Sequence, residues 1–185
     1  MDLEDMAEVS WRNGNLKALK ASLQSGVNLN FRDQWGVTAL IFSLKSPKNV
    51  SAARLFLEQE DIDVDIFDSC HETALHWAAR DDQTSECLAI ILARTTQANP
   101  RDDYGCTALE VAVSSNAVRC VQVLLSDNRT DPNIKSNLNG GGGDSPLMLA
   151  VRNNNVDCVK LLLADPRVDL MIRDEYKKSE EEVAR

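Results

Sequence analysis

The sequence predicts an all-α solenoid of stacked helix-turn-helix units with short β-hairpin-like turns between them. Three observations support this fold class. One short segment recurs along the whole chain, a second apolar segment follows most of its copies, and turn and helix-capping residues occupy fixed places in the copies. Self-similarity with a period of about 20–50 residues is typical of repeat architectures.

The recurring segment reads DQWGVTALIFSL, DSCHETALHWAA and DDYGCTALEVAV, and GGGDSPLMLAV and DEYKKSEEEVA fall into the same frame. A Thr or Ser stands at one place in every copy, namely at Thr38, Thr73, Thr107, Ser145 and Ser179. The period is therefore about 34 to 38 residues, within the range of solenoid repeats.

Each copy predicts a turn followed by two helices. The Asp side chain of Asp-x-x-Gly accepts hydrogen bonds from nearby backbone N–H groups, and Gly tolerates a positive φ. The Thr or Ser then caps the first helix. Small residues on that helix allow a neighbour to approach closely, while the second helix carries the aliphatic blocks RLFL, AIIL, VQVLL and VKLLL. One such unit cannot bury its apolar face alone, so the units are expected to stack.

The frame divides a single domain, 1–185, into an N-terminal cap (1–32), full repeats, and a partial or capping repeat (174–185). The full repeats are predicted at 33–67, 68–101, 102–139 and 140–173. Glu replaces apolar residues in the last segment, DEYKKSEEEVAR, as expected for a polar cap.

This pattern resembles the ankyrin repeat, whose first helix begins Thr-Pro-Leu-His-x-Ala and whose period is about 33 residues. The resemblance covers essentially the whole chain and is best at 73–78, Thr-Ala-Leu-His-Trp-Ala. His71 and Lys177 replace the turn Gly, only Pro146 retains the family Pro, and only His76 retains the family His. The resemblance implies that His76 makes hydrogen bonds within its own repeat or to the adjacent hairpin. The alternative is a metal or acid–base role with Cys70, His71 and Glu72.

Composition narrows the function classes. The net charge is −9, from 29 acidic and 20 basic residues, which disfavours bulk attraction to nucleic acid or to an anionic membrane. The start MDLEDMAEVS lacks the basic and apolar regions of a secretory signal, and LAIILA is too short to span a bilayer. The five cysteines are odd in number and include no Cys-x-x-Cys pair, so we expect an intracellular location, cytoplasmic or nuclear.

The cysteines fall into two groups. One column of the frame holds small residues only: Ala18, Ala52, Cys87, Cys120 and Cys158. Stacked helices lie about 8–10 Å apart, which is too far for a disulfide, so these thiols are predicted to be buried core residues. Cys70 and Cys106 fall on adjacent hairpin tips and are expected to be the accessible thiols. A metal or oxidation site there with His71 is the alternative.

The sequence predicts no catalysis and no cofactor. NLNGGGGDS does not fit a phosphate loop, because Asp144 stands where the loop needs Lys. Nor does the sequence show a Ser/His/Asp or Cys/His arrangement. We therefore predict a non-enzyme without a resident metal or cofactor.

The remaining candidate is a binding surface, and the resemblance implies that a partner docks on the concave face and hairpin tips. One helical place holds Arg12, Lys45, Arg80, Ser114 and Arg152, a basic ladder that favours an acidic peptide partner. The tips add Gln34, Trp35, Cys70, Asp103 and Tyr104 as candidate contacts. One alternative is that Arg or Lys is common at this place in the family generally. Another is that the aromatic residues pack on the next repeat. Trp11 and Trp77 are expected in the core.

We therefore expect a monomeric scaffold or adaptor module that binds a protein or peptide, with no nucleic-acid or membrane partner. The alternative is a stand-alone inhibitor or regulator that blocks an enzyme or a transcription factor by binding.

The glycine run generates a first prediction. Because four consecutive Gly residues restrain φ and ψ very little, GGGG at 140–143 is expected to act as a flexible hairpin tip. Shortening it to one Gly should change the free energy of unfolding by less than about 1 kcal/mol, measured by urea titration. A loss of several kcal/mol would show that the tip is packed.

Overall fold

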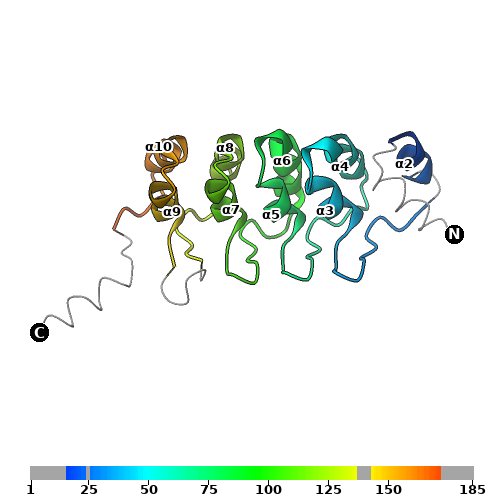
Figure 1. The fold of residues 1–185 in the computed structure, drawn as a ribbon, viewed down its shortest axis with the longest axis horizontal. Coiled ribbons are helices and arrows are strands. Elements are labelled where there is room, and N and C mark those ends of the chain that lie inside the picture. Colours follow the sequence, from blue (N-terminus) through cyan, green and yellow to red (C-terminus); the bar gives the residue numbers. More distant parts are fainter. Residues whose placement is uncertain (1–15, 24–25, 137–142, 172–185) are drawn as a thin grey trace, which may run out of the picture.

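The computed structural model describes residues 16–23, 26–136 and 143–171, which form two rows of helices with turns projecting below them (Figure 1). The outer row holds α2 (Leu16–Leu23), α4 (Val50–Leu57), α6 (Ser85–Arg94), α8 (Val118–Ser126) and α10 (Val156–Ala164). The inner row holds α3 (Ala39–Leu44), α5 (Ala74–Ala78), α7 (Ala108–Ser114) and α9 (Pro146–Arg152). Short 3₁₀ helices, η1 (Pro47–Asn49) and η2 (Asp82–Thr84), precede α4 and α6.

The predicted all-α repeat solenoid is confirmed. Each inner helix packs against the outer helix that follows it and against the next inner helix along the row. The only β-type pairing among the described residues is an isolated bridge between Phe67 and Thr73. Arg12, Trp11, most of the glycine run and the segment 174–185 lie outside the described residues.

The predicted capping residues begin the inner helices. The Thr38 hydroxyl accepts a hydrogen bond from the Ile41 N–H at 3.2 Å, and Ser145 accepts one from Met148 at 3.4 Å. Each cap satisfies a backbone donor that has no partner inside its helix. The capping positions are buried, so the caps also fix how each inner helix enters the core.

The turns before the inner helices, 33–37, 68–72 and 102–106, form what we call the fingers. In the first finger Asp33 Oδ1 accepts the N–H groups of Trp35 and Val37, both at 2.9 Å. Gly36 has a φ of +73°, and a Cβ there would lie 3.1 Å from the Cα of Asp68. Glycine therefore fits both the positive φ of this turn and the close approach of the second finger.

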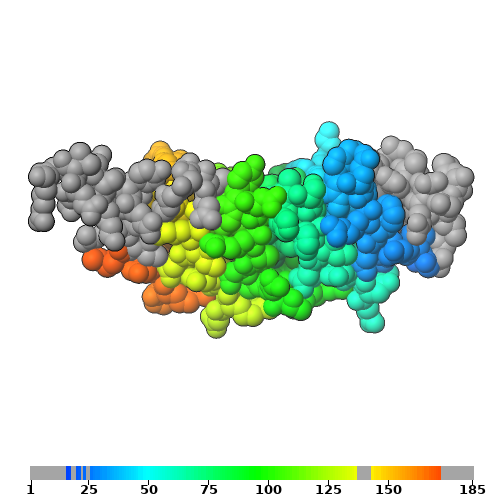
Figure 2. All heavy atoms as spheres, turned by 90° about the horizontal axis from the view of Figure 1, so that it is seen from below, coloured from blue at the N-terminus to red at the C-terminus, as the bar shows by residue number. Residues whose placement is uncertain are grey.

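Adjacent fingers are joined through their backbones. The Ser69 N–H donates to the Trp35 carbonyl at 2.8 Å, and the Asp103 N–H donates to the Cys70 carbonyl at 3.1 Å. Viewed from below, from the finger side, the fingers of successive repeats lie side by side (Figure 2). His71 occupies the turn-Gly place with a φ of +57°, so this finger keeps its shape without glycine.

The core is continuous from repeat to repeat because its contact residues are small. The inner helices carry buried alanines, namely Ala74, Ala78, Ala108, Ala112 and Ala150. Outer-helix aliphatic side chains such as Leu88, Ile91 and Leu124 fill the space between the two rows and are fully buried. The array therefore buries one shared apolar layer, which no single repeat has.

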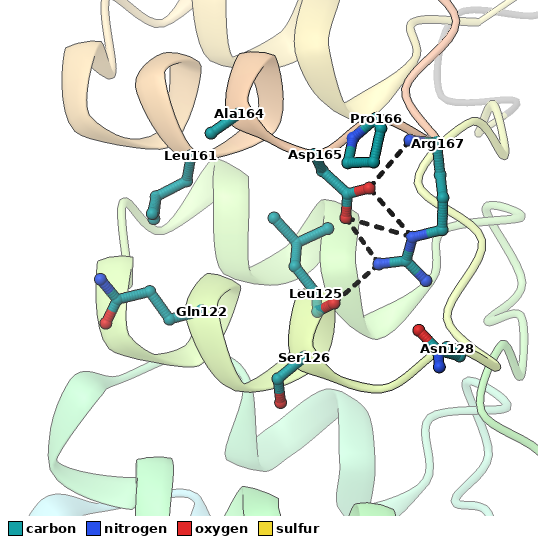
Figure 3. Close-up of a pocket in the computed structure, with 9 residues that line it drawn as sticks. All are labelled: Gln122, Leu125, Ser126, Asn128, Leu161, Ala164, Asp165, Pro166 and Arg167. Atoms are coloured by element: carbon teal, nitrogen blue, oxygen red, sulfur yellow. Dashed lines mark hydrogen bonds and ion pairs between the residues drawn. The ribbon is translucent and has the colours of Figure 1, made fainter.

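Arginine side chains in or just after α6, α8 and α10 tie each of these helices to the outer helix before it. The guanidinium of Arg167 donates to the carbonyls of Leu125, Asp127 and Thr130 at 2.7, 3.1 and 3.0 Å. These carbonyls lie at and just beyond the C-terminal end of α8, where helix carbonyls lack intrahelical partners. Asp165 holds the guanidinium in place and is itself held at a lowered pKa by the hydrogen bond from Arg167 (Figure 3).

We call an arginine that bonds the carbonyls at the end of the preceding outer helix a latch. The same latch occurs at the two preceding junctions. Arg129 donates to the carbonyls of Leu92 and Thr95 at 2.5 and 3.0 Å. Arg94 donates to the carbonyl of Leu57 at 3.0 Å and to two carbonyls in the loop beyond it. Arg129 and Arg167 share an Asp-x-Arg pattern, a signal from which this latch could have been predicted.

The latch generates a prediction about stability. Arg167→Ala removes three charge-assisted hydrogen bonds to helix-end carbonyls, so it should lower the free energy of unfolding by about 2 kcal/mol. Urea denaturation followed by circular dichroism measures the change. Arg119→Ala removes an exposed arginine from α8 and should stay within about 0.5 kcal/mol of the parent. Equal losses in both variants would contradict the latch.

Candidate partner-binding surface

The concave face is defined here as the fingers together with the exposed sides of α3, α5, α7 and α9. Gln34, Trp35, Cys70, Asp103 and Tyr104 lie on the fingers and are exposed. Lys45, Arg80 and Arg152 lie at the C-terminal ends of the inner helices, and Arg80 is the most buried of the three.

The basic ladder is partly neutralised by ion pairs within the protein. Arg80 Nη2 lies 2.5 Å from Oε1 of Glu72, and Arg152 Nη2 lies 2.5 Å from Oδ1 of Asp144. Both acids directly precede the capping residue of the same repeat. Burial raises the pKa of Glu72, and the positive charge of Arg80 opposes that rise. These two arginines therefore present less net charge to a partner than the sequence suggested.

Trp77 packs against the core, as the sequence predicted, but the core does not enclose it. Its ring is only half-buried, and two cations of the ladder lie over it: Lys45 Nζ is 4.4 Å from the ring centroid and the Arg80 guanidinium 3.8 Å. The indole N–H donates to Asp68 Oδ2 at 3.1 Å, which orients the ring. Cation–π attraction to Lys45 and Arg80 makes an aromatic ring favourable at this place.

The ladder is interrupted at Ser114, and a hollow of about 270 Å³ lies there. Two fingers and two inner helices form its walls. It is lined by Cys70, Glu72, Arg80, Asp102, Tyr104, Cys106, Glu110, Val111, Ser114, Ser115 and Leu149. The hollow thus brings together three of the predicted contact residues, Cys70, Arg80 and Tyr104.

Two aromatic side chains stand out on the fingers. Trp35 is 55% exposed and Tyr104 is 62% exposed. The alternative was that these aromatic residues pack on the next repeat, but neither side chain is covered by it. Large aromatic residues exposed at a rim are frequent anchors in protein interfaces.

Asp103, also on a finger, has a partner of its own. Its Oδ1 lies 2.6 Å from His71 Nδ1, and the His71 ring stacks on Phe67 with centroids 4.8 Å apart. Asp103 therefore joins two adjacent fingers as well as facing solvent.

His76 performs the structural role that the resemblance implied. The Thr73 N–H donates to Nδ1 at 3.1 Å, so Nε2 carries the ring proton and donates to the Cys106 carbonyl at 3.2 Å. The ring is fully buried, and burial lowers its pKa, although the bond to Cys106 opposes the shift. A neutral imidazole thus links its own helix start to the next finger.

Glu110 links a helix start to the following segment one repeat later, as His76 does. This role was not predicted from the sequence. Its Oε2 accepts the Thr107 N–H at 2.9 Å, and its Oε1 accepts the Ser136 N–H at 2.8 Å. The group beyond His76 is a carbonyl, whereas the group beyond Glu110 is an N–H. A donor is needed at the first junction and an acceptor at the second. The segments TALH (73–76) and TALE (107–110) therefore differ at their last residue.

The cysteines follow the prediction with one correction. Cys87, Cys120 and Cys158 are fully buried free thiols, as the small-residue column predicted. Cys70 is exposed, but Cys106 is only 6% exposed and is not the accessible thiol that was expected. Its burial raises its pKa to about 12, with a further contribution from the Asp102, Glu110 and Glu72 carboxylates.

A second recess of about 570 Å³ lies on the opposite side of the molecule, between α8 and α10 (Figure 3). Leu125, Leu161 and the Arg167–Asp165 latch line it. It is a seam between two stacked outer helices, and a smaller one of the same kind lies between α6 and α8. Neither seam contains a predicted contact residue.

No cluster of three or more His, Cys, Asp or Glu side chains in the described part is arranged to hold a metal ion. None of the described helices combines the length and apolar character needed to cross a membrane.

Comparison with known families identifies the class of protein. The family model for "Ankyrin repeats (3 copies)" matches residues 6–99 and 63–136, and the model for "Ankyrin repeat" matches residues 142–175. The chain therefore belongs to the ankyrin-repeat family. Ankyrin repeats are generally protein–protein interaction modules and are typically non-catalytic. No curated protein gave a match to the chain.

His76 generates a prediction about pH. Its pKa is lowered in the folded state from an ordinary value of 6.5, so the unfolded chain binds the proton more readily. The stabilisation it provides is present above pH 6.5 and is lost as the pH falls through the lowered value. Urea midpoints should therefore decrease between pH 7.5 and 5, and His76→Gln should reduce that slope.

Glu110→Gln is the matched control, because burial shifts this pKa in the opposite direction. The pKa of Glu110 is raised above its ordinary 4.5, so its contribution is lost as the pH rises through the raised value. The difference in the free energy of unfolding between the parent and Glu110→Gln should therefore be smallest at high pH. The same slope in the parent and His76→Gln would contradict the assignment of a neutral, buried imidazole.

Proposed function

We propose that this ankyrin array is a non-catalytic interaction module that binds a partner protein or peptide on its concave face and finger tips, as a scaffold or adaptor. The observation that carries the proposal is the pair of exposed aromatic residues, Trp35 and Tyr104, on either side of the finger that leads to Arg80. Large aromatic and arginine side chains are the residues most often responsible for interface affinity.

An unpartnered donor on the same face supports this location. Arg80 Nη1 is buried and has no hydrogen-bond partner within the part of the chain that the structure describes. A buried donor without a partner costs about 1–3 kcal/mol. A backbone carbonyl from a partner segment crossing the fingers would remove that cost, so the bound state is favoured.

The acidic partner predicted from the ladder remains a prediction, and its physical basis is reduced. Arg80 and Arg152 are paired with Glu72 and Asp144, and Lys45 lies over Trp77. Exposed ion pairs contribute about 0.2–1 kcal/mol each. We therefore propose that the aromatic anchors provide most of the affinity and that charge determines specificity.

The scaffold role and the alternative role of a stand-alone inhibitor or regulator make different predictions. A scaffold leaves the activity of its bound partner intact, whereas an inhibitor of an enzyme or a transcription factor abolishes it on binding. The intracellular location and the monomeric state expected from the sequence belong to the same proposal.

Site-specific photocrosslinking tests the binding face. A photoreactive phenylalanine analogue in place of Trp35 or Tyr104 should crosslink to the same partner in extracts. The analogue at Gln122, an exposed residue of the outer helix α8, is the matched control and should not crosslink to it. Crosslinking from Gln122 alone would place the interface on the outer helices.

Once a partner is captured, alanine substitution measures the anchor. Trp35→Ala should weaken binding by about 30-fold, or roughly 2 kcal/mol, at low and at high salt, because burial of the indole does not depend on ionic strength. Gln122→Ala should leave the dissociation constant unchanged. A loss below twofold for Trp35→Ala would exclude this finger from the interface.

A further inference from the structure

The hollow at Ser114 exists because the ladder lacks a long side chain there. The same helical place holds Lys45, Arg80 and Arg152 in the other described repeats. Lys45 shows where such a side chain goes, since its ammonium lies over Trp77 of the following repeat. The equivalent path from Ser114 is open and forms a hollow of about 270 Å³.

The walls of the hollow have the two kinds of surface that a long cationic side chain needs. Val111 of the same repeat and Leu149 of the following repeat provide aliphatic surface. The carboxyl groups of Glu72, Asp102 and Glu110 line the rest. Lysine and arginine pack their methylene stems on apolar surface while their charged ends meet polar groups.

The charge of the hollow favours a cation despite the presence of Arg80. The Arg80 guanidinium is already paired with Glu72 at 2.5 Å and stacked on Trp77 at 3.8 Å. Asp102 and Glu110 have no such cationic partner among the interactions of the described residues, and they accept backbone N–H groups instead. Their negative potential reaches Cys106, where it adds to the effect of burial in raising the pKa of the thiol.

We propose that the hollow is a binding site for one arginine side chain supplied by the partner, which takes the place that the ladder leaves vacant at Ser114. The proposal rests on the proposed interaction function and specifies its chemistry. The guanidinium is preferred because its planar donors can contact the partly exposed carboxylate of Asp102 and because it can stack on Tyr104, which is 62% exposed beside the hollow. The partner is then a peptide segment with a basic anchor, in contrast to the acidic segment that the ladder alone suggested.

The test titrates N-acetyl-arginine methylamide into the full ¹⁵N-labelled chain and follows the amide signals by NMR. The signals of Tyr104, Ser114 and Ser115 should move. The neutral analogue N-acetyl-citrulline methylamide has nearly the same shape. It should bind at least about fivefold more weakly than the arginine probe. N-acetyl-glutamate methylamide should not move these signals. Equal binding of the arginine and citrulline probes, or shifts confined to another surface, would overturn the proposal.

Two matched variants place the charge inside or outside the hollow. Ser114→Arg fills the vacant place with an internal arginine and should abolish the response to the probe. Ser126→Arg adds the same charge on the exposed side of α8 and should leave the response unchanged. An unaltered response in Ser114→Arg, with a native circular dichroism spectrum, would refute the site. If Ser114→Arg does not fold, Ser114→Gln partly fills the hollow without charge and should weaken the arginine response at least about threefold.

The outcomes separate this inference from the proposed function. Crosslinking at Trp35 or Tyr104 without an arginine response at Ser114 would overturn the arginine site and leave the interaction module intact. An arginine response without any crosslinking from the concave face would support the site and contradict the proposed docking surface.

Discussion

The structure depends on one constraint, which is that no repeat can bury its apolar face without a neighbour. Alanines at the inner helices and Ala52, Cys87, Cys120 and Cys158 at the outer helices keep the contact surfaces flat enough for close stacking. A larger side chain in either set would separate two repeats and open the shared apolar layer along the whole seam. Stability is therefore a property of junctions, in keeping with the nearest-neighbour energetics of repeat proteins.

Close stacking also buries backbone groups at the seams, and each junction satisfies them with its own chemistry. His76 donates to a carbonyl of the next finger, Glu110 accepts an N–H, and Arg167 covers the carbonyls at the end of the preceding outer helix. Because a buried group without a partner is costly, each of these side chains must match the neighbour that it meets. His76 and Glu110 are thus not interchangeable, even though they occupy the same place in the repeat.

The sequence predicted the features that are local or periodic. Helix caps such as Thr38, the Asp33 turn and the buried cysteine column follow from spacing and residue size alone. It did not predict features that depend on which two side chains meet across a junction. Cys106 looked like a tip residue but is covered by its neighbours, and Trp77 packs against the core but also contacts two cations. The pairing of Arg80 with Glu72 needed the direction of both side chains, which periodicity does not give.

The concave face can change its chemistry without changing the fold, because its variable places lie outside the shared apolar layer. Where the residue before the helix cap is acidic, as at Glu72 and Asp144, the ladder place holds an arginine that pairs with it. Where that residue is Cys106, the ladder place is Ser114 and a hollow lies between the fingers. The charge that a partner meets is therefore set repeat by repeat and is poorly represented by the net charge of −9. A recognition surface of this kind binds a partner through a series of separate side-chain contacts, each controlled by one pair of residues in one repeat.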